Sequence, residues 1–380
     1  MSAIFLAFLR LGLTSFGGPI AHLGYFRTEF VERRRWLDES AYAELVGLCQ
    51  FLPGPASSQV GFSLGLLRGG WGGALAAWAG FTLPSALLLT AFAYGAGSLE
   101  SSAWGAGLLR GLKLAAVAIV AQAVWGMARS LCPDRPRATI GMLATVLACF
   151  APAVGGQLAV IVLGGLAGLV VLRDVRGSEI PAPFTVTVSH RAGLICLVTF
   201  GVLLVASLLW RHGLASGFYR SGALVFGGGH VMLPLLRDAV VTSGRVSESA
   251  FLAGYGATQA VPGPISTFAA YLGAVSDGLP GAATGLVAIF LPGLLLAAGV
   301  LPFWQGLRRL PWSQPAMRGA NAAVVGLLAA ALYDPVWTGS VHRPADFAVA
   351  VTGFVLLVIW RMPPLAIVAL CAVSGLTLGG

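Results

Sequence analysis

The chain has 380 residues, of which 57% are hydrophobic and only 10% charged, and its formal net charge is +9. Soluble domains carry about 25% charged residues, so this composition excludes a water-soluble fold and indicates an integral membrane protein. The apolar stretches reach the roughly 20 residues of a spanning helix, which excludes a barrel of short alternating strands. The basic residues are scattered among short loops, so orientation in a bilayer explains them better than nucleic-acid binding. We expect an all-α polytopic membrane protein.

About thirteen hydrophobic segments follow one another along the chain. They cover residues 3–25, 40–66, 71–97, 104–128, 138–152, 155–172, 191–210, 214–236, 249–275, 279–304, 316–333, 345–361 and 364–379. The one long polar interruption, 173–190, indicates a linker. The predicted organisation is a first transporter repeat (1–172), the linker (173–190), a connecting transmembrane helix (191–213) and a second transporter repeat (214–380).

The two halves carry matching residues in the same order, 208 to 210 positions apart. The matched pairs include Arg10 and Arg220, Gly12 and Gly222, Glu39 and Glu248, Gly47 and Gly256, Gln50 and Gln259, Pro53 and Pro262, Ser57 and Ser266, and Arg110 and Arg318. Three matched blocks with little drift indicate a tandem duplication. Because the connecting helix adds a single crossing, we expect the second repeat to be inverted relative to the first, as in many secondary transporters.

Two kinds of helix-breaking motif recur in both halves. The first and second Pro-Gly-Pro turns are Pro53-Gly54-Pro55 and Pro262-Gly263-Pro264, and the first and second Gly-Gly motifs are Phe16-Gly17-Gly18-Pro19 and Phe226-Gly227-Gly228-Gly229. Proline removes a backbone donor and glycine adds backbone freedom, so none of these segments is expected to be one continuous helix. In hydrocarbon such a break persists only inside protein or beside water. We expect the breaks to form one substrate site; the alternative is that they are kinks and packing contacts.

The charges of the loops help to decide whether these broken segments cross the membrane or re-enter it. The excess of Lys and Arg on one side is steeper if the segments re-enter than if they cross, which favours re-entrant hairpins and a cytoplasmic N-terminus. The preference depends mainly on Arg27, Arg33, Arg34 and Arg35, which have acidic neighbours and are also compatible with an interfacial helix on either face.

The residues after each Pro-Gly-Pro turn are typical of a helix start. Pro55 and Pro264 suit the first helical position, and helix N-termini present unpaired N–H groups and positive potential. Two such ends aimed at one point would bind an anion, with hydroxyls from Ser57, Ser266 and Thr267. The candidate substrate-binding residues are Arg10, Gly17, Gly18, Gln50, Gly54, Ser57, Lys113, Arg220, Gly227, Gly228, Gln259, Gly263, Ser266 and Thr267.

Cations within apolar segments support an anionic substrate. A charge at the centre of a spanning helix costs about 2.5–3.5 kcal/mol, so such residues are usually paired or functional. Arg10, Arg110, Lys113 and Arg220 lie in or beside apolar segments, where Glu44 is nearly the only acidic residue. We therefore expect these cations to lack protein counter-ions; for Arg10 and Arg220 the alternative is that they extend to the interface.

His22, His230 and Glu44 are candidate proton carriers, because imidazole titrates near neutrality. For a single histidine a packed, hydrogen-bonded role is the alternative. The five cysteines show no metal-ligand spacing, and the chain has neither a phosphate-binding loop nor a dinucleotide fingerprint. We expect no metal, no cofactor and no enzyme activity.

Several motifs follow one another in a fixed order along the chain. They are Phe16-Gly17-Gly18-Pro19-Ile20-Ala21-His22, Arg33-Arg34-Arg35-Trp36-Leu37, Cys49-Gln50-Phe51-Leu52-Pro53-Gly54-Pro55 with Gln59, Phe226-Gly227-Gly228-Gly229-His230 with Pro234-Leu235-Leu236, and Gln259-Ala260-Val261-Pro262-Gly263-Pro264. Together these motifs resemble the chromate ion transporter family in its long, two-domain form. The resemblance implies proton-driven efflux of chromate across the bacterial inner membrane and chromate resistance. Sulfate, a dianion of the same shape, is an alternative substrate, and an anion channel is an alternative mechanism. The sequence is compatible with a homodimer but does not predict one.

Overall fold

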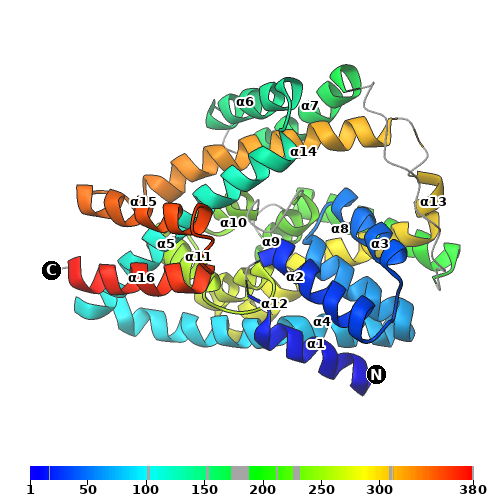
Figure 1. The fold of residues 1–380 in the computed structure, drawn as a ribbon, viewed down its shortest axis with the longest axis horizontal. Helices are drawn as coiled ribbons and strands as arrows, with labels where there is room; N and C mark the ends of the chain where they lie inside the picture. The colour runs from blue at the N-terminus through cyan, green and yellow to red at the C-terminus, as the bar shows by residue number, and fades with distance from the viewer. Residues whose placement is uncertain are drawn as a thin grey trace.

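The computed structural model describes residues 1–16, 18–100, 103–150, 154–172, 188–210, 213–225, 232–307, 310 and 312–378. All regular elements in these ranges are helices, as expected (Figure 1). They are α1 (Ser2–Thr14), α2 (Gly18–Phe26), η1 (Arg27–Arg33), α3 (Glu39–Phe51), α4 (Ala56–Glu100), α5 (Ala103–Leu131), α6 (Arg135–Phe150), α7 (Val154–Val171), α8 (His190–Leu209), α9 (Leu214–Ala223), α10 (Met232–Val240), α11 (Glu248–Thr258), η3 (Ile265–Thr267), α12 (Phe268–Val300), η4 (Leu301–Phe303), α13 (Trp304–Leu307), α14 (Ser313–Ala331), η5 (Leu332–Trp337), α15 (Pro344–Val358) and α16 (Pro364–Leu378).

The helix order of the first half repeats in the second half. α1 matches α9, α3 matches α11, α5 matches α14, and the pair α6–α7 matches α15–α16. The start of α3 and the start of α11 are also capped alike, because Asp38 accepts a hydrogen bond from the Ala41 amide and Ser247 accepts one from the Ala250 amide. α8 connects the halves where the connecting helix was expected, and most of the linker lies outside the described residues.

The halves exchange their last two helices. α5 of the first half packs against α15 and α16, while α14 of the second half packs against α6 and α7. Glycines allow these close contacts. A Cβ on Gly111 would lie 2.2 Å from the Cys371 carbonyl oxygen, and one on Gly168 would lie 2.2 Å from that of Pro315. The two halves therefore form one intertwined body.

The long helices α4 and α12 each double back on themselves. Their backbones leave helical geometry at Gly69–Gly70 and at Asp277–Gly278, where both Gly70 and Gly278 have positive φ near 60°. Beyond each bend the chain returns so closely that a Cβ on Gly65 would lie 2.4 Å from the Gly73 carbonyl oxygen. The apolar segments predicted to end near residues 66 and 275 thus end at hairpin bends.

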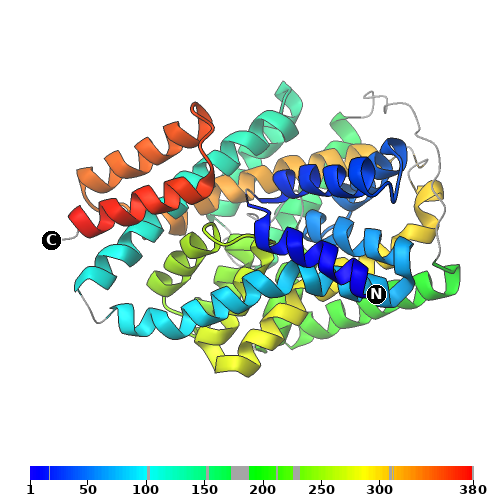
Figure 2. The same cartoon turned by 60° about the horizontal axis from the view of Figure 1, so that its bottom comes forward.

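Five helical stretches are long and apolar enough to cross a membrane: Ala56–Gly95, Trp104–Leu131, His190–Leu209, Ile265–Phe303 and Ser313–Trp337. Shorter apolar helices accompany them, among them Ser2–Thr14, Pro344–Val358 and Pro364–Thr377. The N-terminus lies toward one end of the long axis and the C-terminal helix α16 reaches the other end in both views (Figures 1 and 2). Length and composition thus agree with a multi-pass membrane protein.

Candidate functional site

The first Pro-Gly-Pro turn contacts the second half of the chain. α3 ends at Phe51 and α4 begins at Ala56, so the turn interrupts the helix as predicted. Gly54 has a φ of +128° and donates its amide hydrogen to the Val225 carbonyl, with 2.6 Å between nitrogen and oxygen. Val225 is the residue directly before the second Gly-Gly motif.

The second Pro-Gly-Pro turn makes the equivalent contact with the first half. Gly263 has a φ of +102° and donates its amide hydrogen to the Ser15 carbonyl over 2.9 Å. Ser15 stands directly before the first Gly-Gly motif, at the position that matches Val225. Each turn is therefore hydrogen-bonded to the segment that leads into the other half's Gly-Gly motif.

The same two glycines also contact the long helix of the other half. A Cβ on Gly54 would lie 2.9 Å from the Gly293 Cα in α12, and a Cβ on Gly263 would lie 2.9 Å from the Ser85 Oγ in α4. Gly293 and Ser85 occupy matching positions, each one residue after a matched proline, Pro292 and Pro84. The positive φ at both positions favours glycine, and at Gly54 the close approach of the Gly293 backbone leaves no room for a side chain.

Gln59 holds the first turn in place. This fully buried side chain donates from Nε2 to the carbonyl oxygens of Pro53 (2.9 Å) and Gly293 (3.0 Å). It thereby joins the turn to α12. Among the described residues, its buried Oε1 has no hydrogen-bond partner. The sequence analysis named Gln59 as part of a family motif but predicted no role for it; the signal that could have found it is a long polar side chain near the start of an apolar segment.

The two helix starts after the turns differ. α4 begins as expected, with the Gln59 amide bonded to the Pro55 carbonyl over 3.0 Å. The second half instead begins with the short 3₁₀ turn η3, and α12 follows only at Phe268. The Thr267 hydroxyl donates to the Pro264 carbonyl over 2.7 Å, and the Thr267 amide bonds the same oxygen. These local bonds favour the tighter i to i+3 turn.

The predicted hydroxyl donors are buried beside the breaks. Ser57, Ser266 and Thr267 are each at most 3% exposed. Ser57 Oγ lies 3.3 Å from Nδ1 of the fully buried His22, whose ring packs edge-on against Phe81. Among the described residues, His22 Nε2 has no hydrogen-bond partner.

The first Gly-Gly motif is described from Gly18 onward, and α2 begins there. Gly18 has a φ of +75°, and a Cβ on it would lie 3.5 Å from the Ile265 side chain at the start of η3. Pro19 lies in the first turn of α2, which tolerates proline. Gly17, Gly227, Gly228 and His230 lie outside the described residues.

The predicted cations occupy different environments. Arg10 is exposed on α1, and Arg220 is 8% exposed in α9 and donates a hydrogen bond to the Ser207 carbonyl of α8. Lys113 is half-buried on α5. Gln50 is exposed, Gln259 is half-buried and Glu44 is buried. The described contacts link Gly18 to the start of η3, Gly54 to α12 and Gly263 to α4. Arg10 lies on the surface. We call the two Pro-Gly-Pro turns, together with the residues that contact them, the centre.

The expectation that Glu44 is nearly the only acidic partner is wrong for Arg110. Arg110 donates from Nη2 (2.5 Å) and Nε (3.0 Å) to Oδ1 of Asp346, which is 2% exposed. Asp346 lies in the first turn of α15, 236 residues further along the chain. Only the exchange of helices between halves brings the two together, so local sequence could not reveal the pair.

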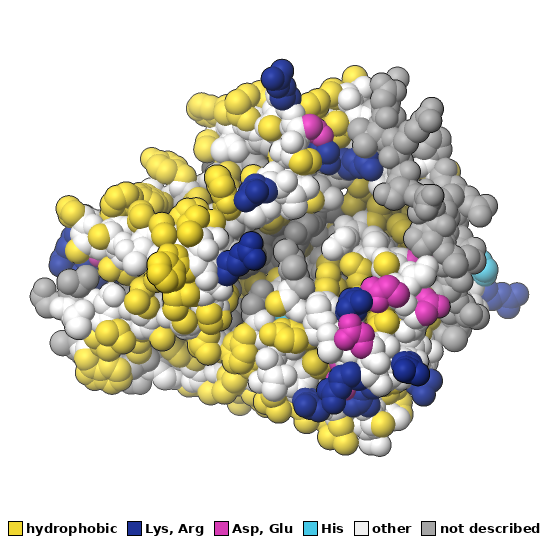
Figure 3. Space-filling view, in the orientation of Figure 1, with side chains coloured by type: hydrophobic (Ala, Val, Ile, Leu, Met, Phe, Trp, Pro, Cys, Tyr) yellow, Lys and Arg dark blue, Asp and Glu magenta, His cyan; other side chains and the backbone are white. Residues whose placement is uncertain are grey.

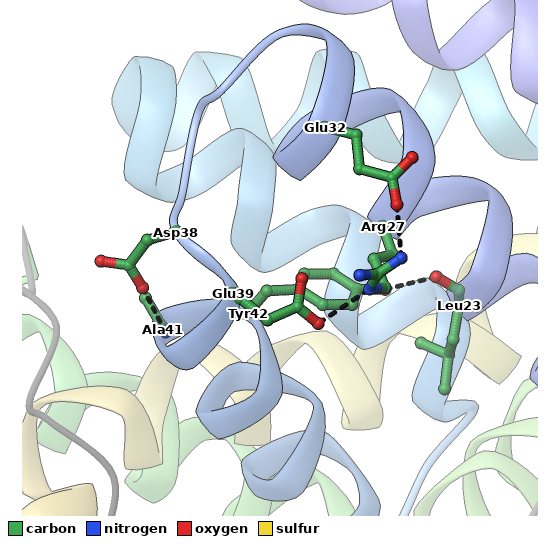
Figure 4. Close-up of polar contacts among 7 residues, drawn as sticks. All are labelled: Leu23, Arg27, Glu32, Asp38, Glu39, Ala41 and Tyr42. Atoms are coloured by element: carbon green, nitrogen blue, oxygen red, sulfur yellow. Dashed lines mark hydrogen bonds and ion pairs between the residues drawn. The ribbon is translucent and has the colours of Figure 1, made fainter.

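Ion pairs tie each α3-type helix to the segment before it. Arg27 Nε donates to Glu39 Oε1 over 2.7 Å and also binds Glu32, while the Tyr42 hydroxyl donates to the Leu23 carbonyl over 2.6 Å (Figure 4). In the second half, Arg237 pairs with Glu248 over 2.9 Å at the matching positions. These contacts join α2, η1 and α3, which we call together the α2–α3 unit; α10 and α11 form its counterpart.

No group of three or more His, Cys, Asp or Glu side chains suited to a metal ion occurs within the described ranges. The centre instead offers glycine backbone, hydroxyls, one imidazole and the start of α4. Backbone amides at a helix start, together with hydroxyls, are suited to binding oxygen atoms of an anion.

Comparison with known proteins agrees with this arrangement of two related halves. The sequence model of the family described as "Chromate transporter" matches residues 2–169 and again 212–376. The chain belongs to the chromate transporter family. The two matched ranges coincide with α1–α7 and α9–α16, and the gap between them contains α8. No solved structure matches the chain.

Among its relatives, this chromate transporter family member is 27% identical to the chromate transport protein of Pseudomonas aeruginosa, over 94% of the chain and 87% of the relative. It is 26% identical to the chromate transport protein of Cupriavidus metallidurans, over 97% of the chain and 91% of the relative. An uncharacterized transporter of Methanocaldococcus jannaschii is 23% identical over 86% of the chain and 82% of its own length. Similarity therefore extends over nearly the whole chain.

Proposed function

We propose that this protein is a secondary transporter that exports chromate across the bacterial inner membrane in exchange for protons. The names of its full-length relatives support chromate as the substrate. The observation that carries the proposal is the reciprocal pair of hydrogen bonds, Gly54 to Val225 and Gly263 to Ser15, which joins the interrupted segments of both halves. Transporters of this architecture bind their substrate at such a repeat interface.

The proposed topology has two inverted repeats with re-entrant hairpins. α1 and α3 have 13 residues each, so each is about 20 Å long and too short for a hydrocarbon core of about 30 Å. The hairpin bends of α4 and α12 and the opposite positions of the chain ends support the same topology. We propose that the N-terminus is cytoplasmic, because the more basic loops then face the cytoplasm.

In the proposed site, the start of α4 and the Ser57 and Ser266 hydroxyls bind the oxygens of the dianion. Gly54 and Gly263 hold the two turns in position beside the bound dianion. We propose that Gly17, Gly18, Gly227 and Gly228 let the dianion approach the backbone, and that Thr267 contributes its hydroxyl to the same site. Arg10, Lys113 and Arg220 attract the anion electrostatically, and Gln50 and Gln259 line its approach. His22, His230 and Glu44 are the proposed proton carriers. We propose no metal and no cofactor.

A channel, or a transporter that prefers sulfate, is the second candidate function. Chromate and sulfate are both tetrahedral dianions, and the same amides and hydroxyls suit either one. Both alternatives differ from the proposal in flux measurements, because a channel does not respond to a proton gradient at fixed membrane voltage and a sulfate transporter takes up chromate only as a weak competitor.

The test is chromate flux in proteoliposomes with an imposed pH difference and the membrane voltage clamped by potassium and valinomycin. We expect flux to rise with the pH difference, to collapse with a protonophore, and to be inhibited less by sulfate than by unlabelled chromate. Flux that ignores the pH difference would contradict proton coupling, and stronger inhibition by sulfate would contradict chromate preference. His22→Gln, His230→Gln and Glu44→Gln in the same assay identify the proton carrier as the variant that transports without responding to pH.

A further inference from the structure

The matched helices α3 and α11 have different surroundings. On α3, Ala43, Gly47 and Gln50 are exposed; they recur at helical spacing and we call them the open face. The matching residues of α11 are Leu252, Gly256 and Gln259, of which the first two are buried and the third half-buried. One sequence pattern therefore occupies two environments in the same molecule.

α5 packs over the face of α11 that corresponds to the open face. A Cβ on Gly256 would lie 2.1 Å from the Leu112 carbonyl oxygen and 3.1 Å from the Leu112 Cα, so the two backbones touch. At the matching Gly47, a Cβ would have nothing within 4 Å. Among the described residues, α3 packs against α4 and η1, and no comparable contact joins it to α14, the counterpart of α5.

A hollow lies where the missing contact would be. In the space-filling view it separates the region of α6, α7 and α14 from the region of α2 and α3, and Lys and Arg side chains stand at its edge (Figure 3). The residue of α14 that matches Leu112 is Ala320. Next to it, the buried Oδ1 of Asn321 has no hydrogen-bond partner among the described residues.

We infer that the open face of α3 is a docking surface for α14 of the same chain, centred on Gly47 and Ala320, in a second conformation of the protein. In that conformation α11 separates from α5. The hollow between α3 and α14 then closes, and an equivalent hollow opens between α11 and α5. In this inference the α2–α3 unit moves as one body, since Arg27, Glu39 and Tyr42 join α3 to the segment before it. This inference rests on the proposed transport function and specifies how access to its site changes sides.

Glycine is needed at position 47 only in the second conformation. Gly47→Val leaves the present structure undisturbed, because its surroundings are empty, but blocks docking on α14 just as a side chain at Gly256 would block docking on α5. The matched control is Gly24→Val in α2, another exposed helical glycine whose added Cβ would have nothing within 4 Å. We expect Gly47→Val to fold normally and to lower chromate flux at least about tenfold, because overpacking at a tight contact disfavours the blocked state. Flux equal to that of Gly24→Val would overturn the inference.

A second measurement reads the conformation without transport. It uses Ala43→Cys, on the open face, in a transport-competent background whose native cysteines are replaced by alanine (Cys49, Cys132, Cys149, Cys196 and Cys371). The rate of reaction with a membrane-impermeant maleimide reports exposure of that face. Gly256→Ala strains the α11–α5 contact, so we expect it to slow labelling about tenfold.

Adding Gly47→Val to the Gly256→Ala variant should restore rapid labelling, because it blocks docking. Labelling that stays rapid in folded Gly256→Ala protein would overturn the inference, as would labelling that stays slow in the double variant. If Gly256→Ala does not fold, the flux comparison between Gly47→Val and Gly24→Val decides. Wild-type protein that moves no chromate would contradict the proposed function, whereas labelling of the Ala43→Cys variants as expected would still support the docking surface.

Discussion

Arg110 of α5 and Asp346 of α15 form an ion pair between the two halves of the chain, and the carboxylate is almost entirely enclosed. Asp346 also accepts hydrogen bonds from the amides of His342 and Arg343, which fixes the start of α15. The pair therefore anchors α15 and α16 on the helix that belongs to the other repeat.

We expect Arg110→Gln to lower the free energy of unfolding by about 3 kcal/mol, because it leaves a buried carboxylate without its counter-charge. Thermal unfolding in detergent measures the loss. The double variant Arg110→Gln with Asp346→Asn should recover part of it, since no uncompensated charge remains. A double variant less stable than either single variant would contradict this account of the pair.

The two turn glycines should respond differently to alanine. At Gly54, the positive φ is combined with contacts to Gln59 and Gly293, so we expect Gly54→Ala to cost at least about 3 kcal/mol and to abolish chromate flux. At Gly263 the closest atom is the Ser85 hydroxyl, so Gly263→Ala should cost less.

Ser85→Gly should partly rescue Gly263→Ala by removing that hydroxyl, and it should not rescue Gly54→Ala. Flux and thermal stability are measured for the three single variants and the two double variants. Equal rescue of both glycine variants would show that the Ser85 contact is not the cause.

We expect Gln59 to stabilise the first Pro-Gly-Pro turn through the two hydrogen bonds that its amide donates. We expect Gln59→Leu to cost about 1–3 kcal/mol, because it leaves the Pro53 and Gly293 carbonyls without their donor. Gln59→Glu should be worse at neutral pH, since a carboxylate faces the same two oxygens. Gln50→Leu, at an exposed position, is the control for stability and should unfold at the wild-type temperature.

Glu29 predicts a pH dependence of stability. Burial alone raises the pKa of Glu29, but the hydrogen bond from Arg34 and the charges of Arg34, Arg33 and Arg10 outweigh it and lower the pKa below the ordinary 4.5. A carboxyl with a lowered pKa stabilises the folded state above its unfolded pKa, and this contribution is lost as the pH falls through the folded pKa.

The wild-type protein should therefore be more stable than Glu29→Gln at pH 7, and the difference should shrink as the pH falls below 4.5. Melting temperatures of both proteins between pH 7 and pH 3.5 measure this convergence. A difference that stays constant across this range would indicate that the charge of Glu29 is not what stabilises the fold.

Residue types and apolar patterns within short stretches of the sequence predicted much of the fold. Proline and glycine placed the interruptions at Pro53–Pro55 and Pro262–Pro264, because a helix cannot continue without its amide donor. The predicted apolar segments end within a few residues of the ends of the observed helices, because the extent of each apolar stretch determines how far its helix continues. The hairpin bends at Gly70 and Gly278 coincide with short gaps between predicted segments.

Contacts between the halves were beyond prediction from composition or spacing. The Arg110–Asp346 pair and the Gln59–Gly293 bond each join residues more than 230 positions apart. Repeat matching related Gly47 to Gly256 but could not reveal that one is exposed and the other covered, because identical patterns differ only in their neighbours. The 3₁₀ turn that begins at Ile265 was not predicted. It depends on the hydrogen bond from the Thr267 hydroxyl to the Pro264 carbonyl, and sequence alone does not distinguish a 3₁₀ turn from an α-helical turn at this place.

The crossed hydrogen bonds of the centre also constrain how the protein is made. When Gly54 leaves the ribosome, its acceptor Val225 has not yet been synthesised, and the Gly54 amide lacks that acceptor until six further described helices, α4 to α9, have followed. The nascent first half therefore enters the bilayer with an unfinished core, and its final folding depends on the arrival of α9. Biogenesis of this protein is completed late, after the translating ribosome has passed the connecting helix.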